Sequence, residues 1–246
     1  MKNIIVHIPH ASIEVPKLFK ERLLIDEDEF KKENIFEADY LIDTFKPKDF
    51  IVLSSNYSRM FCDVERFKEN EEMEKYSMGL QYQKDTNGKR FIRIDKVLKE
   101  YCYKYYDNHH YLLNKLSTDC LKKYGSCIIL DLHSFSDEYV YKLFGKSNCP
   151  DICIGVNQEY DNNLLTFVDD LFKRNGYSTN INYPYSGTMI PSKYLNKKNT
   201  GIKSIMIEVN KRVYLKDDLK AIDTNKTNKL SKCFDELYRY LLNNYC

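Results

Sequence analysis

Three side chains that bind metals or move protons stand at apolar runs in the sequence. His10 follows the run NIIVHI, His133 follows the run CIILD, and Glu208 lies inside the run SIMIEV. Two imidazoles and a carboxylate form the protein ligand set of many catalytic zinc sites, in which water holds the fourth position. A further carboxylate can act as general base on that water. These residue types predict metal-assisted hydrolysis, with Glu208 as the candidate base.

Each of these residues also allows a structural interpretation. An unpaired glutamate is costly to bury, so Glu208 needs an arginine, a metal ion or a catalytic proton. His10 could simply hydrogen-bond its own loop. Asp131 precedes His133 by two residues and faces the same side of an extended segment, where it could orient a metal-bound imidazole. We expect His7 to pack on the opposite face of its strand.

The strongest candidate for the third metal ligand lies in the segment IFEADY, which carries an acidic pair at the start of a predicted helix. Glu37 and Asp39 are two residues apart, so both cannot face one metal ion from a helix. One of them is expected to be a ligand and the other a helix N-cap. The alternative is that both only complement the helix dipole.

The apolar runs predict strands, and the amphipathic stretches between them predict helices. Strands that alternate with helices are typical of an α/β fold with a mostly parallel sheet and helices on both faces. Ligands bind such sheets beyond the carboxyl ends of the strands, where His10, His133 and Glu208 would meet. The predicted strands are 3–8, 50–54, 127–131, 152–156 and 204–209, and the predicted helices are 38–45, 93–124, 159–174 and 216–245, the last with a possible break near 225–228.

The chain shows no internal repeat and no low-complexity linker, so residues 1–246 are predicted to form a single domain. The polar stretch 68–89 is expected to be a long surface loop or a lid. Eight cysteines are scattered without a C-x-x-C pair. In a reducing compartment such cysteines are expected to be buried free thiols rather than a disulfide frame or a zinc knuckle.

Composition excludes several classes of protein. The 38 basic and 36 acidic residues give a net charge of +2, which lacks the broad basic footprint of a nucleic-acid binder. A hydrophobic content of 43% argues against disorder. No apolar run approaches the roughly 20 residues that span a bilayer, and MKNIIVHIPHAS lacks the features of a signal peptide. We therefore expect a cytoplasmic protein.

Seven segments occur in an informative order: PHAS at 9–12, EADY at 37–40, YSRMFCDVER at 57–66, LDLHS at 130–134, PDICIG at 150–155, NYPYSG at 182–187 and IEVNKRVYL at 207–215. This set resembles the N-formylglutamate amidohydrolase (N-formylglutamate deformylase) family over about residues 4–215. The resemblance implies a three-layer, phosphorylase/hydrolase-like α/β/α fold related to zinc carboxypeptidases and zinc-dependent muramoyl-alanine amidases. It also implies hydrolysis of an N-acyl amino acid, such as N-formylglutamate to formate and glutamate in histidine degradation.

Carried over position by position, the resemblance assigns roles to residues of this sequence. It makes His10 and His133 metal ligands and Asp39 the preferred carboxylate ligand, with Glu37 as the alternative. It makes Glu208 the base that takes the proton of the water and delivers it to the leaving amine.

The resemblance also predicts which residues bind the substrate. It puts Arg59, Asp63 and Arg66 where a substrate carboxylate would be recognised, and its aromatic loop corresponds to Asn182, Tyr185 and Gly187. A bidentate contact from Arg59 would hold the scissile amide against the metal.

Two positions depart from the family pattern, and both lie where specificity would be set. Glu65 stands where the family has an amide, and Thr188-Met189 stands where it has Gly-His. The reaction class is therefore better defined than the substrate.

The sequence as a whole predicts a zinc-dependent amidohydrolase that acts on a small-molecule N-acyl amino acid, without nucleic-acid or membrane partners. Two histidines and a carboxylate also suit Mn, Fe or Co. One alternative is a zinc amidase or peptidase that acts on cell-wall fragments or other N-acyl substrates. Another is a binding protein that kept the fold and lost catalysis.

Overall fold

The computed structural model describes residues 2–246, which form two compact units. The sheet unit comprises 2–8, 41–53 and 113–246, and the loop unit comprises Pro9–Tyr40 and Ser54–Leu112. Helix α3 (Lys96–Tyr124) runs without a break from the loop unit into the sheet unit. Within 2–246, none of the helices has the length and apolar character that crossing a membrane requires.

A six-stranded sheet forms the centre of the sheet unit, in the order β2-β1-β3-β6-β4-β5. Neighbours β1, β3 and β6 are parallel, β4 is antiparallel to β6, and β5 is parallel to β4. This confirms the predicted mostly parallel, mixed sheet. The strands are β1 (Ile4–Ile8), β2 (Ile51–Ser54), β3 (Cys127–Phe135), β4 (Ile152–Gly155), β5 (Thr179–Ile181) and β6 (Ile202–Asn210).

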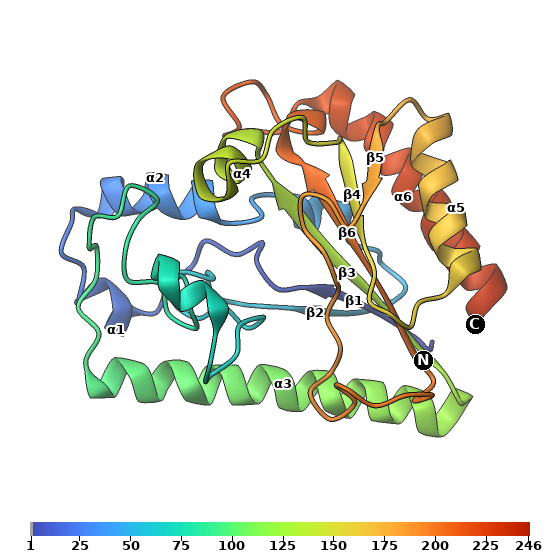
Figure 1. The fold of residues 1–246 in the computed structure, drawn as a ribbon, viewed down its shortest axis with the longest axis horizontal. Coiled ribbons are helices and arrows are strands. Elements are labelled where there is room, and N and C mark those ends of the chain that lie inside the picture. Colours follow the sequence, from blue (N-terminus) through green and yellow to red (C-terminus); the bar gives the residue numbers. More distant parts are fainter. Residues whose placement is uncertain (1) are drawn as a thin grey trace. The chain divides into compact units, whose positions relative to one another are not determined.

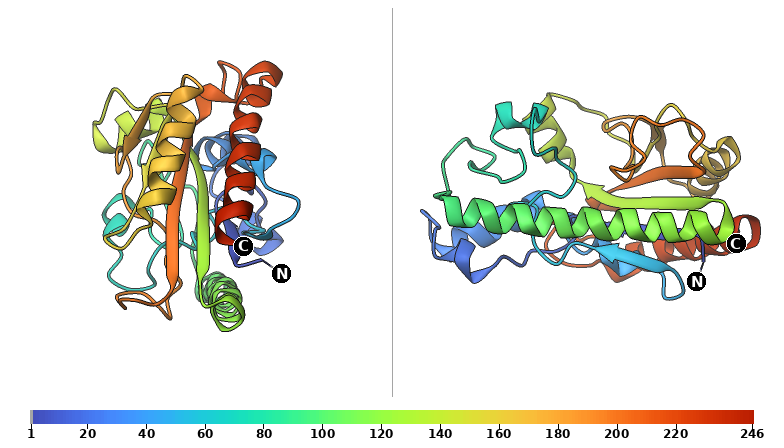
Figure 2. Two further views of the ribbon diagram at one scale, coloured as in Figure 1. Left: turned by 90° about the vertical axis from the view of Figure 1, so that its right-hand side faces the viewer. Right: turned by 90° about the horizontal axis from the view of Figure 1, so that it is seen from below.

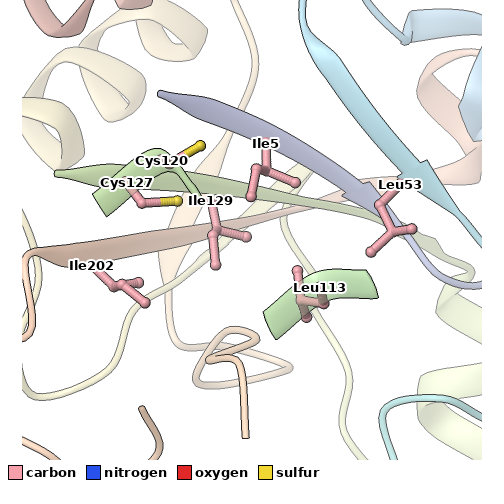
Figure 3. Packing of buried hydrophobic residues seen from close by; sticks show 7 residues of the cluster. All are labelled: Ile5, Leu53, Leu113, Cys120, Cys127, Ile129 and Ile202. Atoms are coloured by element: carbon pink, nitrogen blue, oxygen red, sulfur yellow. The ribbon is translucent and has the colours of Figure 1, made fainter. Parts of the chain in front are cut away.

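One face of the sheet packs on the second half of α3, as Figure 3 shows. Ile5 of β1 and Ile129 of β3 lie in this cluster with Leu113 of α3. β-branched side chains suit a pleated surface, and burying one such side chain contributes about 1.5–3 kcal/mol. Alternate residues of a strand share a face. The face that packs on α3 therefore also carries Asp131 and His133.

Helices α5 (Asn162–Arg174) and α6 (Thr224–Tyr245) lie side by side on the other face of the sheet (Figure 1 and Figure 2). The rings of Phe167 and Tyr240 stack between them with their centroids 3.6 Å apart. Helices on both faces confirm the three-layer arrangement that the sequence predicts.

The predicted C-terminal helix begins later than expected and is not broken. The Asp223 carboxylate accepts hydrogen bonds from the N–H groups of Asn225 and Lys226, which makes it the N-cap of α6. A capping aspartate satisfies amide groups that have no partner in the first turn. The polar run near 225–228 is therefore the first turn of α6 rather than a break.

Several short elements escaped prediction: α1 (Lys17–Lys20), α2 (Glu27–Glu37), α4 (Asp137–Phe144) and β5. The sequence of α2 is mainly charged, so it shows little helical periodicity of apolar residues. Its helix is instead fixed by the N-cap Asp26, whose side chain accepts from the Glu29 N–H.

The helix predicted at 38–45 is wrong. Helix α2 ends at Glu37, Ala38 is extended, and only a 3₁₀ turn at Ile42–Phe45 follows. Glu37 is therefore the last residue of a helix and Asp39 follows it, so neither opens a helix or serves as its N-cap.

The segment 68–89 of the loop unit contains a 3₁₀ turn at Glu72–Tyr76. Met78, Leu80 and Tyr82 are buried, so this part of the segment is not the surface loop that its polar composition predicts. The role of the segment as a lid stays a prediction.

The cysteines agree with the expectation from the sequence. All eight are free, and every one except Cys246 is buried. They pack as small apolar side chains, such as Cys120 and Cys127 in the core beside α3 (Figure 3).

Candidate metal centre

His133 lies in the last part of β3, which extends four residues beyond its predicted end at 131. Its Nε2 lies 3.1 Å from Oδ1 of Asp131, and both side chains are buried. The distance places Asp131 beside the His133 imidazole, and its role in orienting that ring stays a prediction. Burial alone would raise the pKa of Asp131, but the imidazoles of His133 and His7 hold it well below its usual range.

His7 belongs to the same group of side chains. In the parallel pairing of β1 and β3, His7 lies directly opposite Asp131, and its Nδ1 is 2.8 Å from Asp131 Oδ1. Paired residues of neighbouring strands face the same side of a sheet. The expectation that His7 packs on the opposite face is therefore wrong.

Glu208 is paired with His133 in the register of β3 and β6. It therefore shares the face of the sheet that carries His133. Its side chain is 7% exposed. On the other side, Glu208 pairs with Cys153 of β4, whose thiol pKa is raised to about 12, first by burial and then by the glutamate charge. A buried carboxylate beside an imidazole has the placement expected of a general base.

His10 lies in the loop unit, where buried acids surround it. Its Nε2 is 2.9 Å from Asp63 Oδ1, and its Nδ1 is 3.6 Å from Asp39 Oδ2. Burial and the Arg59 charge lower the pKa of His10, whereas Asp63 and Asp39 raise it. The net result is a pKa above the ordinary value.

Asp63 is completely buried and is the centre of a charged cluster. Arg59 donates to its Oδ2 from Nε at 3.2 Å and from Nη2 at 2.9 Å, and the Tyr82 hydroxyl donates to the same oxygen at 3.1 Å. Nε of Arg66 lies 3.7 Å away. Burial would raise the pKa of Asp63, but Arg66, His10 and Arg59 hold it well below its usual range.

Inside the loop unit, Asp63 is hydrogen-bonded to the His10 imidazole. The prediction that Asp63, Arg59 and Arg66 recognise a substrate carboxylate is not tested by these contacts and stays a prediction.

The two candidate carboxylate ligands differ in their contacts. The Asp39 N–H donates to the His10 carbonyl oxygen at 2.9 Å, so backbone and side chain both place Asp39 beside His10. Glu37 is also buried, at the last residue of α2. The closeness of Asp39 to Nδ1 of His10 favours Asp39 as the ligand.

Glu65, where the sequence departs from the family pattern, lies in the same part of the loop unit. Its Oε2 is 3.8 Å from Nε2 of His10, and its side chain is 17% exposed. An acid in place of an amide therefore adds negative charge directly beside a predicted metal ligand.

The loop with Asn182, Tyr185 and Gly187 follows β5 in the sheet unit. Asn182 has φ 55°, and its Oδ1 accepts from the N–H groups of Val156 and Gly187. The Tyr185 ring packs edge-on against Phe135. These contacts shape the loop, and the predicted role of its residues in substrate binding stays a prediction.

The loop approaches the sheet closely at Gly155 of β4. A Cβ atom on Gly155 would lie only 2.1 Å from the Gly187 carbonyl oxygen. Only glycine permits so close an approach of two backbones. The last residue of β4 thus sets the position of the predicted substrate loop.

Sequence reasoning missed two supporting residues, His7 and Tyr82. His7 could have been found from its apolar strand, because a buried imidazole needs a polar partner. Tyr82 had no comparable signal, since it lies in a polar stretch and its partner Asp63 is 19 positions away in the sequence.

The donor groups in both units are of the types that bind divalent metal ions. The sheet unit supplies His133, whose Nε2 lies 3.1 Å from an oxygen of the buried Asp131. The loop unit supplies His10, whose Nε2 is hydrogen-bonded to the buried Asp63, and the Asp39 carboxylate beside it. An aspartate on one ring nitrogen is the usual support of an imidazole that binds a metal through the other.

Comparisons with known proteins decide the family. The model of the N-formylglutamate amidohydrolase family matches residues 2–215. The chain belongs to the N-formylglutamate amidohydrolase family. The matched stretch includes residues of both the sheet unit and the loop unit. A search of curated proteins finds no significant match.

Solved structures of similar fold agree with this family. The N-formylglutamate amidohydrolase from Ralstonia eutropha JMP134 has a TM-score of 0.82 and 16% identity, covering 98% of this chain and 95% of its own. A gene product from Agrobacterium tumefaciens has a TM-score of 0.69 and 15% identity, covering 98% of this chain and 92% of its own. At this level of identity the two likenesses establish the fold of an N-formylglutamate amidohydrolase.

Proposed function

We propose that this member of the N-formylglutamate amidohydrolase family is a metal-dependent enzyme. It hydrolyses the amide bond of an N-acyl amino acid such as N-formylglutamate, and both units form its single domain. The observation that carries the proposal is that two buried histidines, His10 and His133, have Nε2 2.9 Å and 3.1 Å from an oxygen of a buried aspartate. Such support is typical of imidazoles that bind metal ions.

The metal ligands in this proposal are His10, Asp39 and His133. Chain connectivity supports the grouping, because His10 follows the last residue of β1 by two positions and β1 pairs with β3. Asp39 is tied to His10 by a backbone hydrogen bond. Zinc is the preferred ion for two imidazoles and one carboxylate with an open position.

When bound, the metal ion would lower the pKa of a water molecule towards about 7 and polarise the scissile carbonyl. Glu208 accepts the proton of the attacking water and donates it to the nitrogen of the leaving amino acid. Its pairing with His133 in the sheet register supports this role. Because little of Glu208 is exposed, bulk water solvates its carboxylate only weakly. This also favours transfer of a proton to the carboxylate.

The side chains of the loop unit orient the substrate in this proposal. The Nε and Nη2 side of the Arg59 guanidinium contacts Asp63, so a substrate carboxylate would approach from the side of Nη1. Arg66 adds positive charge beside it. Asn182 and Tyr185 would donate hydrogen bonds to the acyl group or to the developing oxyanion.

Metal analysis combined with an activity assay tests the proposal. Purified protein is analysed for bound metal and assayed for release of formate or acetate from N-formyl and N-acetyl amino acids, with Glu208→Gln as the matched control. The proposal expects about one metal ion per chain, N-acyl hydrolysis by the wild type, and metal without hydrolysis in the variant. Hydrolysis that persists after complete removal of the metal would overturn the metal-dependent mechanism.

A further inference from the structure

Five charged side chains of the loop unit are linked to the His10 imidazole, either directly or through Asp63. They are the acids Asp39, Asp63 and Glu65 and the bases Arg59 and Arg66. In the proposed function a divalent ion would balance Asp39. Two acids then remain for two arginines, so this group offers no excess positive charge to a second carboxylate of a substrate.

Asp63 neutralises part of the charge of both arginines. Arg59 donates to its Oδ2 through Nε and Nη2, and Nε of Arg66 lies 3.7 Å from the same oxygen. Asp63 is 0% exposed and Asp39 is 2% exposed, so neither meets a molecule that arrives from solvent. The charges that such a molecule meets must come from the other side chains of the group.

Glu65 is the most exposed acid of this group. Its side chain is 17% exposed, and those of Arg59 and Arg66 are 11% and 19% exposed. A molecule that approaches the two arginines therefore meets the Glu65 carboxylate as well. An ionised carboxylate only accepts hydrogen bonds. It can bind the N–H groups of an amide, whereas it repels a second carboxylate.

Glu65 and Asp39 contact different nitrogens of the His10 ring. Nδ1 of His10 is 3.6 Å from Asp39 Oδ2, whereas Nε2 is 2.9 Å from Asp63 Oδ1 and 3.8 Å from Glu65 Oε2. The proposed metal position beside Asp39 is therefore separated from Glu65 by the imidazole ring. A substrate whose acyl carbonyl reaches the metal extends several bonds beyond its amide, which suits contact between its side chain and Glu65.

The backbone fixes the position of Glu65 independently of its side chain. Its N–H donates to Asp63 Oδ1 at 3.1 Å, and the Arg66 N–H donates to the Asp63 carbonyl oxygen at 3.2 Å. Nε2 of His110 in α3 lies 2.8 Å from the Val64 carbonyl oxygen and holds the same turn. A turn that is ordered before substrate binds lowers the entropic cost of recognition. It also lets a substitution at position 65 change the charge while the backbone keeps its contacts.

We propose that Glu65 is a specificity-determining residue for the side chain of the substrate. It favours N-acyl amino acids whose side chain donates hydrogen bonds, such as N-formylglutamine, over those whose side chain is a carboxylate, such as N-formylglutamate. The inference rests on the proposed function for the reaction and names the substrate class of that same site. The α-carboxylate, which both compounds carry, is left to the arginines. Discrimination comes from an attractive contact with the amide and from repulsion of the acid.

Measurement of kcat/KM for the two compounds in wild type, Glu65→Gln and Glu65→Asp tests this inference. Each protein is assayed with saturating zinc, and its metal content is measured. Wild type should prefer N-formylglutamine. One charge a few ångströms away in a partly exposed site changes binding by about tenfold. In Glu65→Gln the ratio of the two kcat/KM values should therefore shift about tenfold towards N-formylglutamate, whereas Glu65→Asp keeps the charge and should keep the wild-type preference.

Glu69→Gln is the matched control, because it makes the same change of charge at an exposed residue of the loop unit. It should leave the ratio at the wild-type value. The inference is overturned if wild type prefers N-formylglutamate, if Glu65→Gln leaves the ratio unchanged, or if Glu69→Gln shifts it as much as Glu65→Gln. A loss of preference in Glu65→Asp as complete as in Glu65→Gln would assign the effect to shape rather than charge, which also overturns it.

Equilibrium binding separates this inference from the proposed function. Calorimetric titration of both compounds into zinc-loaded Glu208→Gln, and into the double variant that also carries Glu65→Gln, needs no hydrolysis. The ratio of the two affinities should shift by about tenfold between these proteins. Such a shift without any hydrolysis by wild type would support the role of Glu65 and contradict the proposed function. Hydrolysis of both compounds with the same preference in every protein would support the proposed function and overturn the role of Glu65, as would a failure of both compounds to bind.

Discussion

His133 and His10 each contact a buried aspartate, but the two aspartates are supported by different chemistry. Asp131, in the sheet unit, is held by a second imidazole and a backbone N–H. Asp63, in the loop unit, is held by the guanidinium of Arg59 and the hydroxyl of Tyr82, with Arg66 nearby. One support is built of an imidazole and a backbone N–H on the sheet, and the other of guanidinium groups and a hydroxyl on loops.

The difference teaches how each scaffold restrains its ligand. A strand already fixes the direction of His133, so Asp131 needs only two donors, one on each oxygen, that set the plane of its carboxylate. His10 follows a strand and lies on a loop, where charge-assisted hydrogen bonds supply the missing restraint. The same charges make the loop unit more sensitive to substitution, because removing one partner leaves buried charges uncompensated.

The strongest disruption of both supports is removal of the imidazole itself. His133→Ala and His10→Ala should each abolish activity. Structural zinc sites bind with about 10–16 kcal/mol from four ligands, so losing one ligand should weaken zinc binding by at least about 100-fold. Metal content after dialysis and the rate of hydrolysis measure the effect. Full occupancy in either variant would contradict the ligand assignment.

Glu208→Gln should separate chemistry from metal binding. The amide has nearly the same shape but cannot accept the proton of the water. Activity should therefore fall by about 10²–10⁴-fold, while metal content remains that of wild type. Comparison of kcat with metal content checks this outcome, and near-normal turnover would assign the base to another residue.

Arg59→Ala tests whether the cationic support also binds substrate. A hydrogen bond to a charged group contributes about 1.5–3 kcal/mol, so kcat/KM for formylglutamate should fall by roughly 10- to 150-fold. The loss should be smaller for formylglutamine, which lacks the side-chain charge. Arg59→Lys should restore little, because an ammonium cannot make the planar two-point contact. Equal losses on both substrates would restrict Arg59 to supporting Asp63 and the α-carboxylate.

Asp63→Asn and Asp131→Asn compare the two supports directly. Each should weaken zinc affinity by about 10- to 100-fold. Only Asp63→Asn leaves two arginines beside a neutral amide, so it should lose more stability, by up to about 3–5 kcal/mol. Urea unfolding of the metal-free variants measures this difference. Equal stability losses would show that Arg59 and Arg66 find other partners.

The same contrast explains how far the sequence could be interpreted. The strands and the pairing of His133 with Asp131 follow from apolar runs and from the two-residue repeat of a strand, both of which are local signals. The buried Asp63, by contrast, accepts a hydrogen bond from Tyr82, which lies in a polar segment without periodicity. The position of Glu37 and Asp39 was misjudged because the charged sequence of α2 hides a helix whose beginning is fixed by Asp26.

The smallest expected effect is a pH dependence that belongs to the His10 side of the comparison. The folded protein holds the pKa of His10 above its ordinary value through Asp63 and Asp39, against the opposing effect of burial. Because folding raises the pKa of His10, protonation of its imidazole stabilises the metal-free protein. This stabilisation is complete at pH values below the pKa of His10 in the unfolded protein, near 6.5. It is lost as the pH rises through the pKa of His10 in the folded protein. Metal binding has the opposite dependence, because the imidazole must be neutral to act as a ligand.

Zinc affinity should therefore fall by up to about tenfold for each pH unit below the folded pKa of His10, since one proton competes for the site. Asp63→Asn removes a group that raises this pKa. Proton competition should then begin at a lower pH, and the affinity profile should shift in the acid direction. Asp131→Asn leaves the environment of His10 within the loop unit unchanged and serves as the control. Zinc titrations of the three proteins between pH 5.5 and about 8 measure the shift. Identical profiles in wild type and Asp63→Asn would show that Asp63 does not control the protonation of His10.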